Sequence, residues 1–266
     1  MTNIGNRGYT LQKDKYSIDY INNIKNDLTL KPFSCVDYGA QSNEFCIYAE
    51  SKKKLYLPRY FGFEKLGEPE SYKLNMGEPA NLNFNGSLKE IQKPIVDAYM
   101  ESVNNKIVGG GVITIPCGYG KTVLGLYLAS RLKLRTLVVV HKEFLLNQWI
   151  DRIKQFLPES SVGRIQSNIV RKDNDIVIGM LQSISMIEYP EDTFRDFGFV
   201  IFDECHHLGA EVFSRALFKT NARYTLGLSA TPNRSDGLTK VFHWYLGPTL
   251  YSIKQRTDNN VKVKMI

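Results

Sequence analysis

Short apolar runs separated by turns or helical segments recur between residues 111 and 229, and this alternation restricts the fold more than any other feature. The runs are GVITI, TLVVV, DIVIGM, FVIFD and YTLGLS, and helical spacing is found from about Thr122 to Lys133 and over EFLLNQWIDRIKQF. Strands that lack polar alternation are buried on both faces, as happens when helices cover a parallel sheet from two sides. The pattern predicts a doubly wound α/β domain over about residues 87–250.

A further helix is expected just before the first of these strands. In SLKEIQKPIVDAYMESV the apolar residues recur at helical spacing, and Ser87 followed by Glu90 matches a capping box. Residues 1–84 differ in texture: we expect a helix around YSIDYINNIKNDL and short strands in EFCIYAESKKKLYLPRYFGF. The stretch GEPESYKLNMGEPANLNFNG is rich in Gly, Pro and Asn, which is typical of a connection between domains. The expected organisation is a small N-terminal α+β domain (1–84), a larger domain (85–250) and a linker (251–266).

The overall composition excludes several classes of protein. No apolar run reaches the roughly 18 residues of a membrane span, and the N-terminus has no apolar signal region, so a soluble protein with no membrane partner is expected. The 4 cysteines show no C-x-x-C spacing, which favours free thiols in a reducing intracellular compartment, the nucleus or cytoplasm, or a virion for a viral protein. The net charge of +7 is compatible with nucleic-acid binding, although many solvated surfaces carry as much.

The stretch ITIPCGYGKT (residues 113–122) lies where the first strand ends, which is where ligands bind in open α/β sheets. It matches the phosphate-binding pattern G-x-x-x-x-G-K-[ST], except that Ile115 replaces the first glycine. Gly118 and Gly120 would let backbone N–H groups approach phosphate oxygens, Lys121 would contact the β- and γ-phosphates, and Thr122 would ligate Mg²⁺. The alternative is a glycine turn that binds nothing. The predicted ATP-binding loop comprises Pro116, Cys117, Gly118, Tyr119, Gly120, Lys121 and Thr122.

An acidic pair follows a later apolar strand in FGFVIFDECHH (residues 197–207). That strand would deliver Asp203 and Glu204 to the same edge of the sheet, where Asp203 can hold Mg²⁺ and Glu204 can deprotonate an attacking water. A metal cluster is the rival interpretation, since Asp, Cys and His are all ligand types. A tight turn after a strand would, however, spread these side chains apart. The loop and the acidic pair together favour a nucleotide hydrolase.

Three motifs occur in the order PCGYGKT, then DECH after an apolar strand, then LSATP beginning 25 residues after Asp203. This order resembles superfamily 2 helicases and translocases. The resemblance covers about residues 87–250 and implies the first of that family's two RecA-like domains. LGLSATPNRSDGL followed by FHWYLGP looks most like the XPB-type branch, which includes phage UvsW-like proteins and the transcript-release helicases of poxviruses and other large DNA viruses. This superfamily commonly has another small or apolar residue in place of the first glycine.

Specific roles are implied by this resemblance, with ATP and Mg²⁺ as cofactors. Gln92 resembles the upstream glutamine that reads adenine, although a solvated helix residue is the plain alternative. Lys121, Asp203 and Glu204 would be catalytic, with Thr122 and Asp203 holding Mg²⁺. The residues implied to couple hydrolysis to nucleic-acid contact are His206, Ser229, Ala230 and Thr231.

Contacts to nucleic acid are implied more weakly. VVVHKEFLLNQW places His141 and Lys142 near a backbone phosphate, whereas Gln148 and Trp149 are expected to pack in the following helix. IGMLQSIS places Gln182 and Ser183 at a helix start that could donate N–H groups to phosphate. Ordinary caps or solvated side chains explain these residues equally well. SKKKLYLPRYFGF interleaves basic and aromatic residues, which suits an accessory nucleic-acid domain or a short amphipathic hairpin with a basic face.

The second RecA-like domain of the resembled family supplies a Q-x-x-G-R-x-x-R motif, and this sequence has none. Arginines from that motif contribute several orders of magnitude to phosphoryl transfer. We therefore expect the front part of a longer helicase or translocase that is weakly active alone and acts on DNA rather than RNA. The transcription machinery is a further expected partner. The alternatives are a restriction-type motor subunit and a non-catalytic nucleic-acid-binding module.

Overall fold

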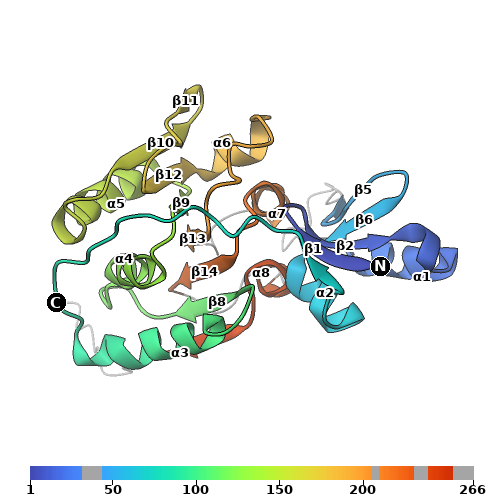
Figure 1. The fold of residues 1–266 in the computed structure, drawn as a ribbon, viewed down its shortest axis with the longest axis horizontal. Helices are drawn as coiled ribbons and strands as arrows, with labels where there is room; N and C mark the ends of the chain where they lie inside the picture. The colour runs from blue at the N-terminus through green and yellow to red at the C-terminus, as the bar shows by residue number, and fades with distance from the viewer. Residues whose placement is uncertain (32–43, 205–209, 231–238, 254–266) are drawn as a thin grey trace, which may run out of the picture.

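The computed structural model describes residues 1–31, 44–204, 210–230 and 239–253 (Figure 1). Its centre is an eight-stranded sheet with the order β11-β10-β12-β9-β13-β14-β8-β15. All neighbouring pairs are parallel except β10 and β11. The strands are β8 (Gly109–Thr114), β9 (Thr136–Val140), β10 (Val162–Gln166), β11 (Ile169–Val170), β12 (Ile176–Met180), β13 (Phe199–Asp203), β14 (Tyr224–Ser229) and β15 (Thr249–Ser252). The predicted parallel α/β sheet is confirmed.

Side chains of the central strands enter two different cores. In β9, Leu137 and Val139 pack on one side of the sheet, while Val138 and Val140 pack on the other. Because successive side chains of a strand point to opposite faces, a strand covered on both faces must be apolar throughout. This is the physical reason for the continuous apolar runs in the sequence.

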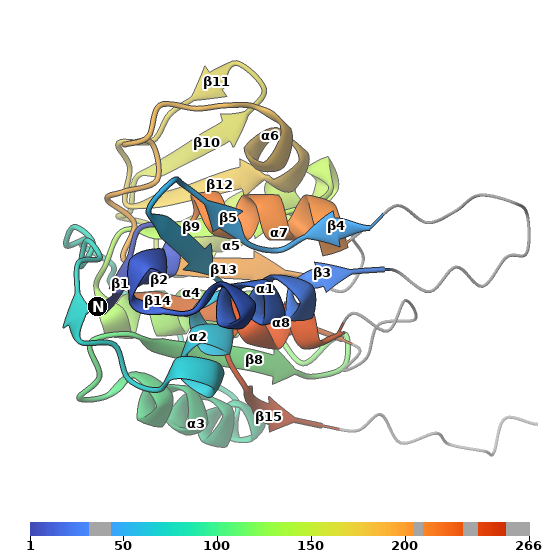
Figure 2. The same ribbon diagram turned by 90° about the vertical axis from the view of Figure 1, so that its right-hand side faces the viewer.

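Helices cover both faces of this sheet. One face carries α3 (Lys93–Val103), α4 (Lys121–Leu132) and α5 (Glu143–Phe156). The opposite face carries α6 (Leu181–Met186), α7 (Ala210–Lys219) and α8 (Thr239–Leu246). Figure 2, turned by 90°, shows the parallel strands running in one direction, so their carboxyl ends lie at one edge.

The N-terminal region is a second, smaller sheet with helices. Its order is β5-β6-β2-β1-β7, and β3 pairs separately with β4. The elements are β1 (Thr2–Gly5), β2 (Gly8–Gln12), η1 (Lys13–Lys15), α1 (Ile18–Asp27), β3 (Thr29–Leu30), β4 (Phe45–Cys46), β5 (Ala49–Glu50), β6 (Lys54–Leu57), α2 (Arg59–Leu66) and β7 (Ser71–Tyr72). It packs on the large domain through α2, where the rings of Phe61 and Trp244 meet edge to face with centroids 5.0 Å apart.

The segment that joins the two sheets is firmly attached to the large domain. It crosses the amino ends of the central strands, where Glu78 N donates to Asp196 O at 2.9 Å and Ala80 N donates to Lys133 O at 3.0 Å (Figure 1). A Cβ added at Gly77, which has φ +83°, would lie 2.1 Å from Gly198 Cα. The glycine is therefore required by a close backbone approach, and Ala80 and Leu82 of the segment are buried in the core of the large domain.

The capping box predicted at Ser87 is wrong. A 3₁₀ turn, η2 (Glu90–Gln92), precedes α3, which begins at Lys93. Pro94 in the first turn of α3 has no N–H to donate to an earlier carbonyl, so the α-helix cannot continue back to residue 88. The expected strand ending in RYFGF is also wrong at its end, because Arg59 begins α2. Strands β10, β11 and β15 were not anticipated.

Candidate nucleotide-binding site

The predicted phosphate loop joins β8 to α4 at the carboxyl edge of the sheet. Gly118 and Gly120 have φ of +84° and +80°, a left-handed conformation that glycine adopts without strain. Ile115, which occupies the position of the missing first glycine, is fully buried, and its N–H donates to Ser229 O at 3.0 Å. An apolar residue thus serves as the last core contact before the loop begins.

Gln92 is buried against this loop, and its side chain is 3% exposed. Gln92 Oε1 accepts from Lys89 N at 2.9 Å, and Nε2 donates to Tyr119 O at 3.0 Å. A Cβ at Gly120 would lie 2.6 Å from Gln92 Nε2, so glycine is needed for this contact. In the structure Gln92 therefore braces the loop, while its predicted contact with adenine stays a prediction.

Lys121 and the acidic pair come together at the start of α4. Lys121 Nζ lies 2.8 Å from Glu204 Oε1, and these side chains are only 10% and 16% exposed. Glu204 has φ +50°, a conformation that is strained for a non-glycine residue and tends to occur at functional sites. The turn after β13 thus directs the Glu204 carboxylate toward the phosphate loop.

Asp203 is held by the indole of a tryptophan. Trp149 Nε1 donates to Asp203 Oδ2 at 2.7 Å, and the aspartate is 7% exposed. Burial, with a smaller contribution from the neighbouring Glu204 carboxylate, raises the pKa of the Asp203 carboxyl to about 6. The hydrogen bond from Trp149 and the charge of Lys121 act in the opposite direction. A nearby cation would stabilise the charged form of a carboxylate in such surroundings.

The chemistry of these side chains fits a magnesium ion. Among the described residues, Asp203 Oδ1 is buried and has no hydrogen-bond partner. Carboxylate and hydroxyl oxygens are ligands that Mg²⁺ accepts beside nucleotide phosphates. Thr122, in the first turn of α4, and Asp203 line the same cavity of about 410 Å³. They are the residues that would hold the ion.

One wall of this cavity comes from α5, a helix that was not predicted to contribute to the site. Leu145, Gln148 and Arg152 line it together with Cys117, Gly118 and Glu204. The expectation that Gln148 packs in the helix is wrong, because this residue is exposed and lines the cavity. Trp149 packs in the core as expected, but its hydrogen bond to Asp203 was missed. The only hint in the sequence is a tryptophan, whose N–H needs an acceptor when buried, on the apolar face of a helix.

The residues predicted to couple the site to nucleic acid are only partly described. Ser229, at the end of β14, is 3% exposed, and Ala230 follows it. The hydrogen bond from Ile115 N to Ser229 O joins the two predicted motifs directly. His206 and Thr231 lie outside the described residues.

Residues predicted to contact nucleic acid lie at the ends of β9 and β12. Gln182 Nε2 donates to His141 O at 3.1 Å, so the two predicted segments meet. His141 is 8% exposed, whereas Lys142 is exposed. The Ser183 hydroxyl accepts from Ser167 N at 2.9 Å. Of this group, Lys142 and Gln182 are the exposed residues.

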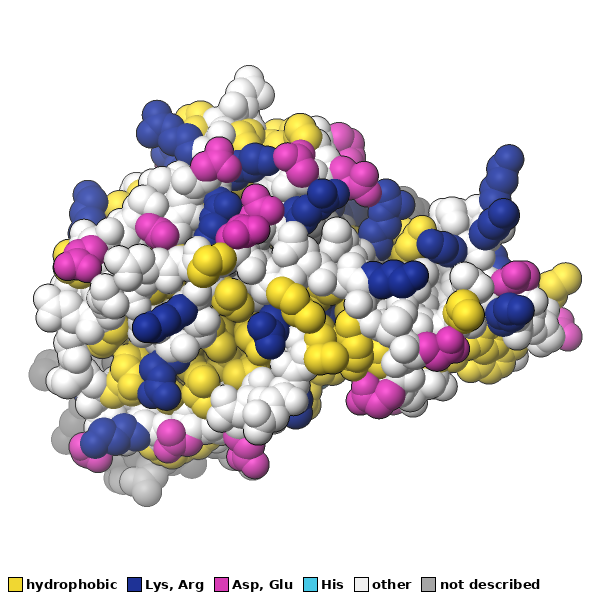
Figure 3. Space-filling model, in the orientation of Figure 1, with side chains coloured by type: hydrophobic (Ala, Val, Ile, Leu, Met, Phe, Trp, Pro, Cys, Tyr) yellow, Lys and Arg dark blue, Asp and Glu magenta, His cyan; other side chains and the backbone are white. Residues whose placement is uncertain are grey.

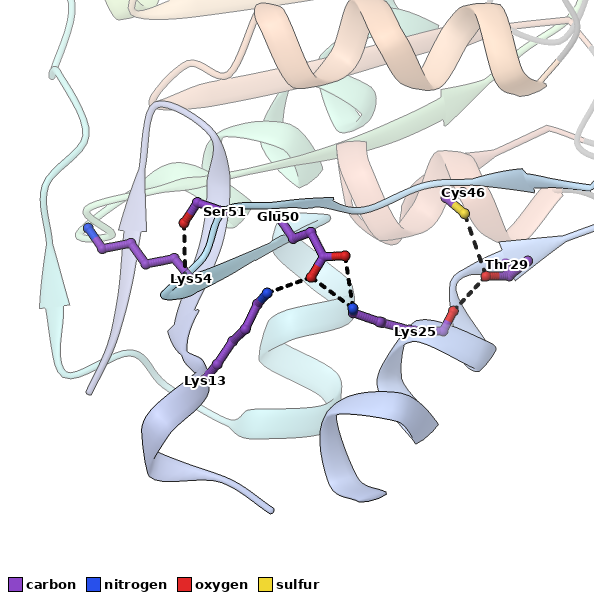
Figure 4. Close-up of polar contacts among 7 residues, drawn as sticks. All are labelled: Lys13, Lys25, Thr29, Cys46, Glu50, Ser51 and Lys54. Carbon is purple, nitrogen blue, oxygen red and sulfur yellow. Dashed lines mark hydrogen bonds and ion pairs between the residues drawn. The ribbon is translucent and has the colours of Figure 1, made fainter. Parts of the chain in front are cut away.

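The lysines of SKKKLYLPRYFGF are exposed, whereas Arg59 is buried. Lys52, Lys53 and Lys54 are exposed at the β5–β6 hairpin, while Phe61 is fully buried. Nearby, Glu50 accepts from Lys13 at 2.5 Å and from Lys25 at 2.8 Å (Figure 4). In Figure 3 basic and acidic side chains are interspersed on the face shown. The exposed lysines give the hairpin the basic face that the amphipathic interpretation expects, while a role in nucleic-acid binding stays a prediction.

The predictions of no membrane span and no metal cluster can be compared only with the described part of the chain. No helix there is long and apolar enough to cross a membrane. Within the same residues, Cys46 and Cys117 are free thiols, and no group of three or more His, Cys, Asp or Glu side chains could hold a metal ion. Cys205, His206 and His207, which belong to the rival metal-cluster interpretation, lie outside the described residues.

Comparison with known proteins agrees with this geometry. The chain is 40% identical over 99% of its length to protein L396 of Acanthamoeba polyphaga mimivirus, whose name describes an ATP-dependent RNA helicase. It is 32% identical over 170 residues, 62% of the chain, to the DNA 3'-5' translocase XPB2 of Sulfurisphaera tokodaii. It spans 51% of the mimivirus protein and 35% of the archaeal protein.

A solved structure with the same fold is the UvsW helicase of bacteriophage T4. The TM-score is 0.60 at 16% identity, over 88% of this chain and 94% of that one. The family described as type III restriction enzyme, res subunit, matches residues 85–234. With the loop, the acidic pair and the parallel sheet in place, the chain belongs to this family and, with its helicase relatives, to superfamily 2.

Proposed function

We propose that this chain is the ATP-binding part of an ATP-driven nucleic-acid motor. The observation that carries the proposal is the convergence of Lys121, Asp203 and Glu204 on one cavity at the start of α4. Phosphoryl transfer needs positioned charges more than covalent help, and these three side chains supply one positive and two negative groups. They are the groups that the reaction requires.

The proposed roles follow from the contacts. Backbone N–H groups of the loop and Lys121 bind the phosphates, and Thr122 and Asp203 hold Mg²⁺, which when bound neutralises charge on the β- and γ-phosphates. Glu204 orients and deprotonates the attacking water. The 2.8 Å pair between Lys121 and Glu204 then describes the nucleotide-free state. Phosphate would draw Lys121 away and release Glu204 for its role as base.

We further propose that a second RecA-like domain supplies the arginine that completes the site. The support is that the chain spans about half of its mimivirus relative. It also contains no Q-x-x-G-R-x-x-R motif. An arginine of this kind contributes about 10³–10⁵-fold in related enzymes, so the chain alone should bind Mg-ATP and hydrolyse it slowly.

DNA is the substrate that we propose. The support is the likeness to the archaeal translocase, whose name gives DNA, whereas the mimivirus relative carries RNA in its name. Residues that grip a sugar-phosphate backbone do not by themselves distinguish the two polymers. The experiment must therefore compare both.

The test measures ATP hydrolysis by the full-length native protein with duplex DNA, single-stranded DNA and RNA of matched sequence. We expect hydrolysis to be stimulated by DNA and abolished by Lys121→Ala, with Lys154→Ala on the exposed side of α5 as the matched control. Stimulation by RNA alone would reject DNA as the substrate. Binding of nucleic acid without hydrolysis by the wild type would support the non-catalytic module instead.

A further inference from the structure

The indole of Trp149 lies in direct contact with the predicted magnesium ligand. Trp149 is fully buried, and its Nε1 donates to Asp203 Oδ2 at 2.7 Å. The two residues come from α5 and β13 and are 54 positions apart. A buried hydrogen bond of this length between a neutral donor and a carboxylate is short and directional.

Other residues fix the position of the indole. Trp149 lies on the buried face of α5 with Leu146 and Ile153, both fully buried. On the facing helix α4, a Cβ at Gly125 would lie 2.9 Å from Trp149 Cη2. Glycine destabilises the interior of a helix, so its presence at position 125 is explained by the space that the indole needs. The ring therefore has little freedom to move away from Asp203.

The hydrogen bond makes the two oxygens of the Asp203 carboxylate unequal. Oδ2 is occupied by the indole, whereas Oδ1 has no hydrogen-bond partner among the described residues. Without the indole, the carboxylate could rotate about its side-chain torsions. With it, Oδ1 is the oxygen available to a ligand. Groups that hold a metal-binding carboxylate in this way commonly change metal affinity by about 10–100-fold.

We propose that Trp149 is a positioning residue that orients the Asp203 carboxylate for the magnesium ion of bound nucleotide. This inference rests on the proposed function, because it presumes a Mg-nucleotide in the cavity. The Trp149 side chain has no polar atom other than Nε1, so it acts on the ion only through Asp203. The effect should therefore appear in the metal-dependent part of nucleotide binding alone.

The experiment measures the affinity of the full chain for ADP by calorimetry, once in excess Mg²⁺ and once in EDTA. The ratio of the two affinities isolates the contribution of the metal. Trp149→Phe should lower this ratio about tenfold or more and leave the affinity in EDTA unchanged. The matched control is Trp244→Phe, because the chain has 2 tryptophans and Trp244 packs on Phe61, away from the site. That control should keep the wild-type ratio.

A second readout uses the Trp244→Phe protein, in which Trp149 is the remaining tryptophan. Its fluorescence should change when Mg²⁺ is added to the ADP complex, and Asp203→Asn should remove that change. If Trp149→Phe fails to fold, Gly125→Ala replaces it, since the added Cβ displaces the indole without removing its N–H. It should lower the same ratio.

An unchanged ratio in a folded Trp149→Phe or Gly125→Ala protein would overturn the inference while leaving the proposed function intact. A loss of ADP affinity in EDTA equal to the loss in Mg²⁺ would also overturn it, because that result indicates a general packing role. A wild-type chain that binds ADP in neither condition would overturn the proposed function and this inference together.

Discussion

In the absence of Mg²⁺, Asp203→Asn should stabilise the protein although it removes a predicted catalytic group. Burial, with a further contribution from Glu204, raises the pKa of the Asp203 carboxyl from 3.8 to about 6. A group whose pKa is higher in the folded state stabilises the fold at pH values below its unfolded pKa. That contribution is lost as the pH rises from about 4 through about 6. At pH 8 the folded protein holds a buried carboxylate that the asparagine variant lacks.

The expected magnitude follows from these two pKa values. The difference between 3.8 and about 6 corresponds to about 3 kcal/mol, because one pKa unit is about 1.4 kcal/mol. Asparagine can still accept from Trp149 through its oxygen, but its amide N–H₂ takes the place of Oδ1, which has no partner among the described residues. A buried donor without a partner costs about 1–2 kcal/mol. The net gain at pH 8 is therefore about 1–2 kcal/mol, or about 2–6 °C in the melting temperature.

The assay is thermal unfolding in EDTA at several pH values between 5 and 8. The difference between Asp203→Asn and wild type should grow as the pH rises. Glu204→Gln serves as the control, because the Glu204 carboxylate pairs with Lys121 at 2.8 Å and its removal should give no gain. With Mg-ADP present the order should reverse, since the wild type alone keeps the ligand for the ion. An Asp203→Asn protein that melts at or below wild type in EDTA at pH 8 would refute the electrostatic argument.

Three further predictions concern the connecting segment, the loop and the N-terminal hairpin. Gly77→Ala should lower the free energy of unfolding by about 3 kcal/mol, because the added Cβ would overlap backbone atoms. Gly118→Ala should lower it by only about 1 kcal/mol, because the added Cβ would have no atom within 4 Å and only the left-handed backbone is strained; equal losses in urea denaturation would contradict this. Gln92→Leu leaves Tyr119 O without its donor and should lower the free energy of unfolding by about 1–2 kcal/mol in the same measurement. An unchanged urea midpoint would show that the hydrogen bond from Gln92 to the loop contributes nothing to stability. Replacing Lys52–Lys54 with alanine should make the slope of log K for DNA binding against log salt concentration shallower by about 2–3. An unchanged slope would show that the hairpin has no role in DNA binding.

The large sheet could be predicted from the sequence because its signal is local and repeated. TLVVV and FVIFD are apolar at every position, and a strand must be so when helices cover both of its faces. Helix α5 was predicted with its observed bounds, Glu143–Phe156, because its signal is also local and repeated: its apolar residues recur at helical spacing. Strands at or next to the edges of the sheet were missed: β10 has an alternating pattern, and β15 is short and partly exposed, so both resemble loop sequence.

The N-terminal domain was less predictable. RYFGF has the aromatic content of a strand, yet it forms the start of α2, where Phe61 packs on Trp244 of the large domain. That packing partner lies far along the chain and leaves no trace in the local pattern. Tertiary contact therefore overrode local propensity in this segment.

By itself the sequence determined the chemistry of the site: a glycine loop that ends in Lys121, and an acidic pair after a buried strand. Both rest on consecutive residues whose spacing is set by the geometry of a strand followed by a turn. The tertiary structure alone decided what supports them. The hydrogen bonds from Trp149 to Asp203 and from Gln92 to the loop join residues that are 54 and 27 positions apart. The sequence around one partner therefore gives no sign of the other. Such contacts exist only once the sheet has brought α4, α5 and β13 together.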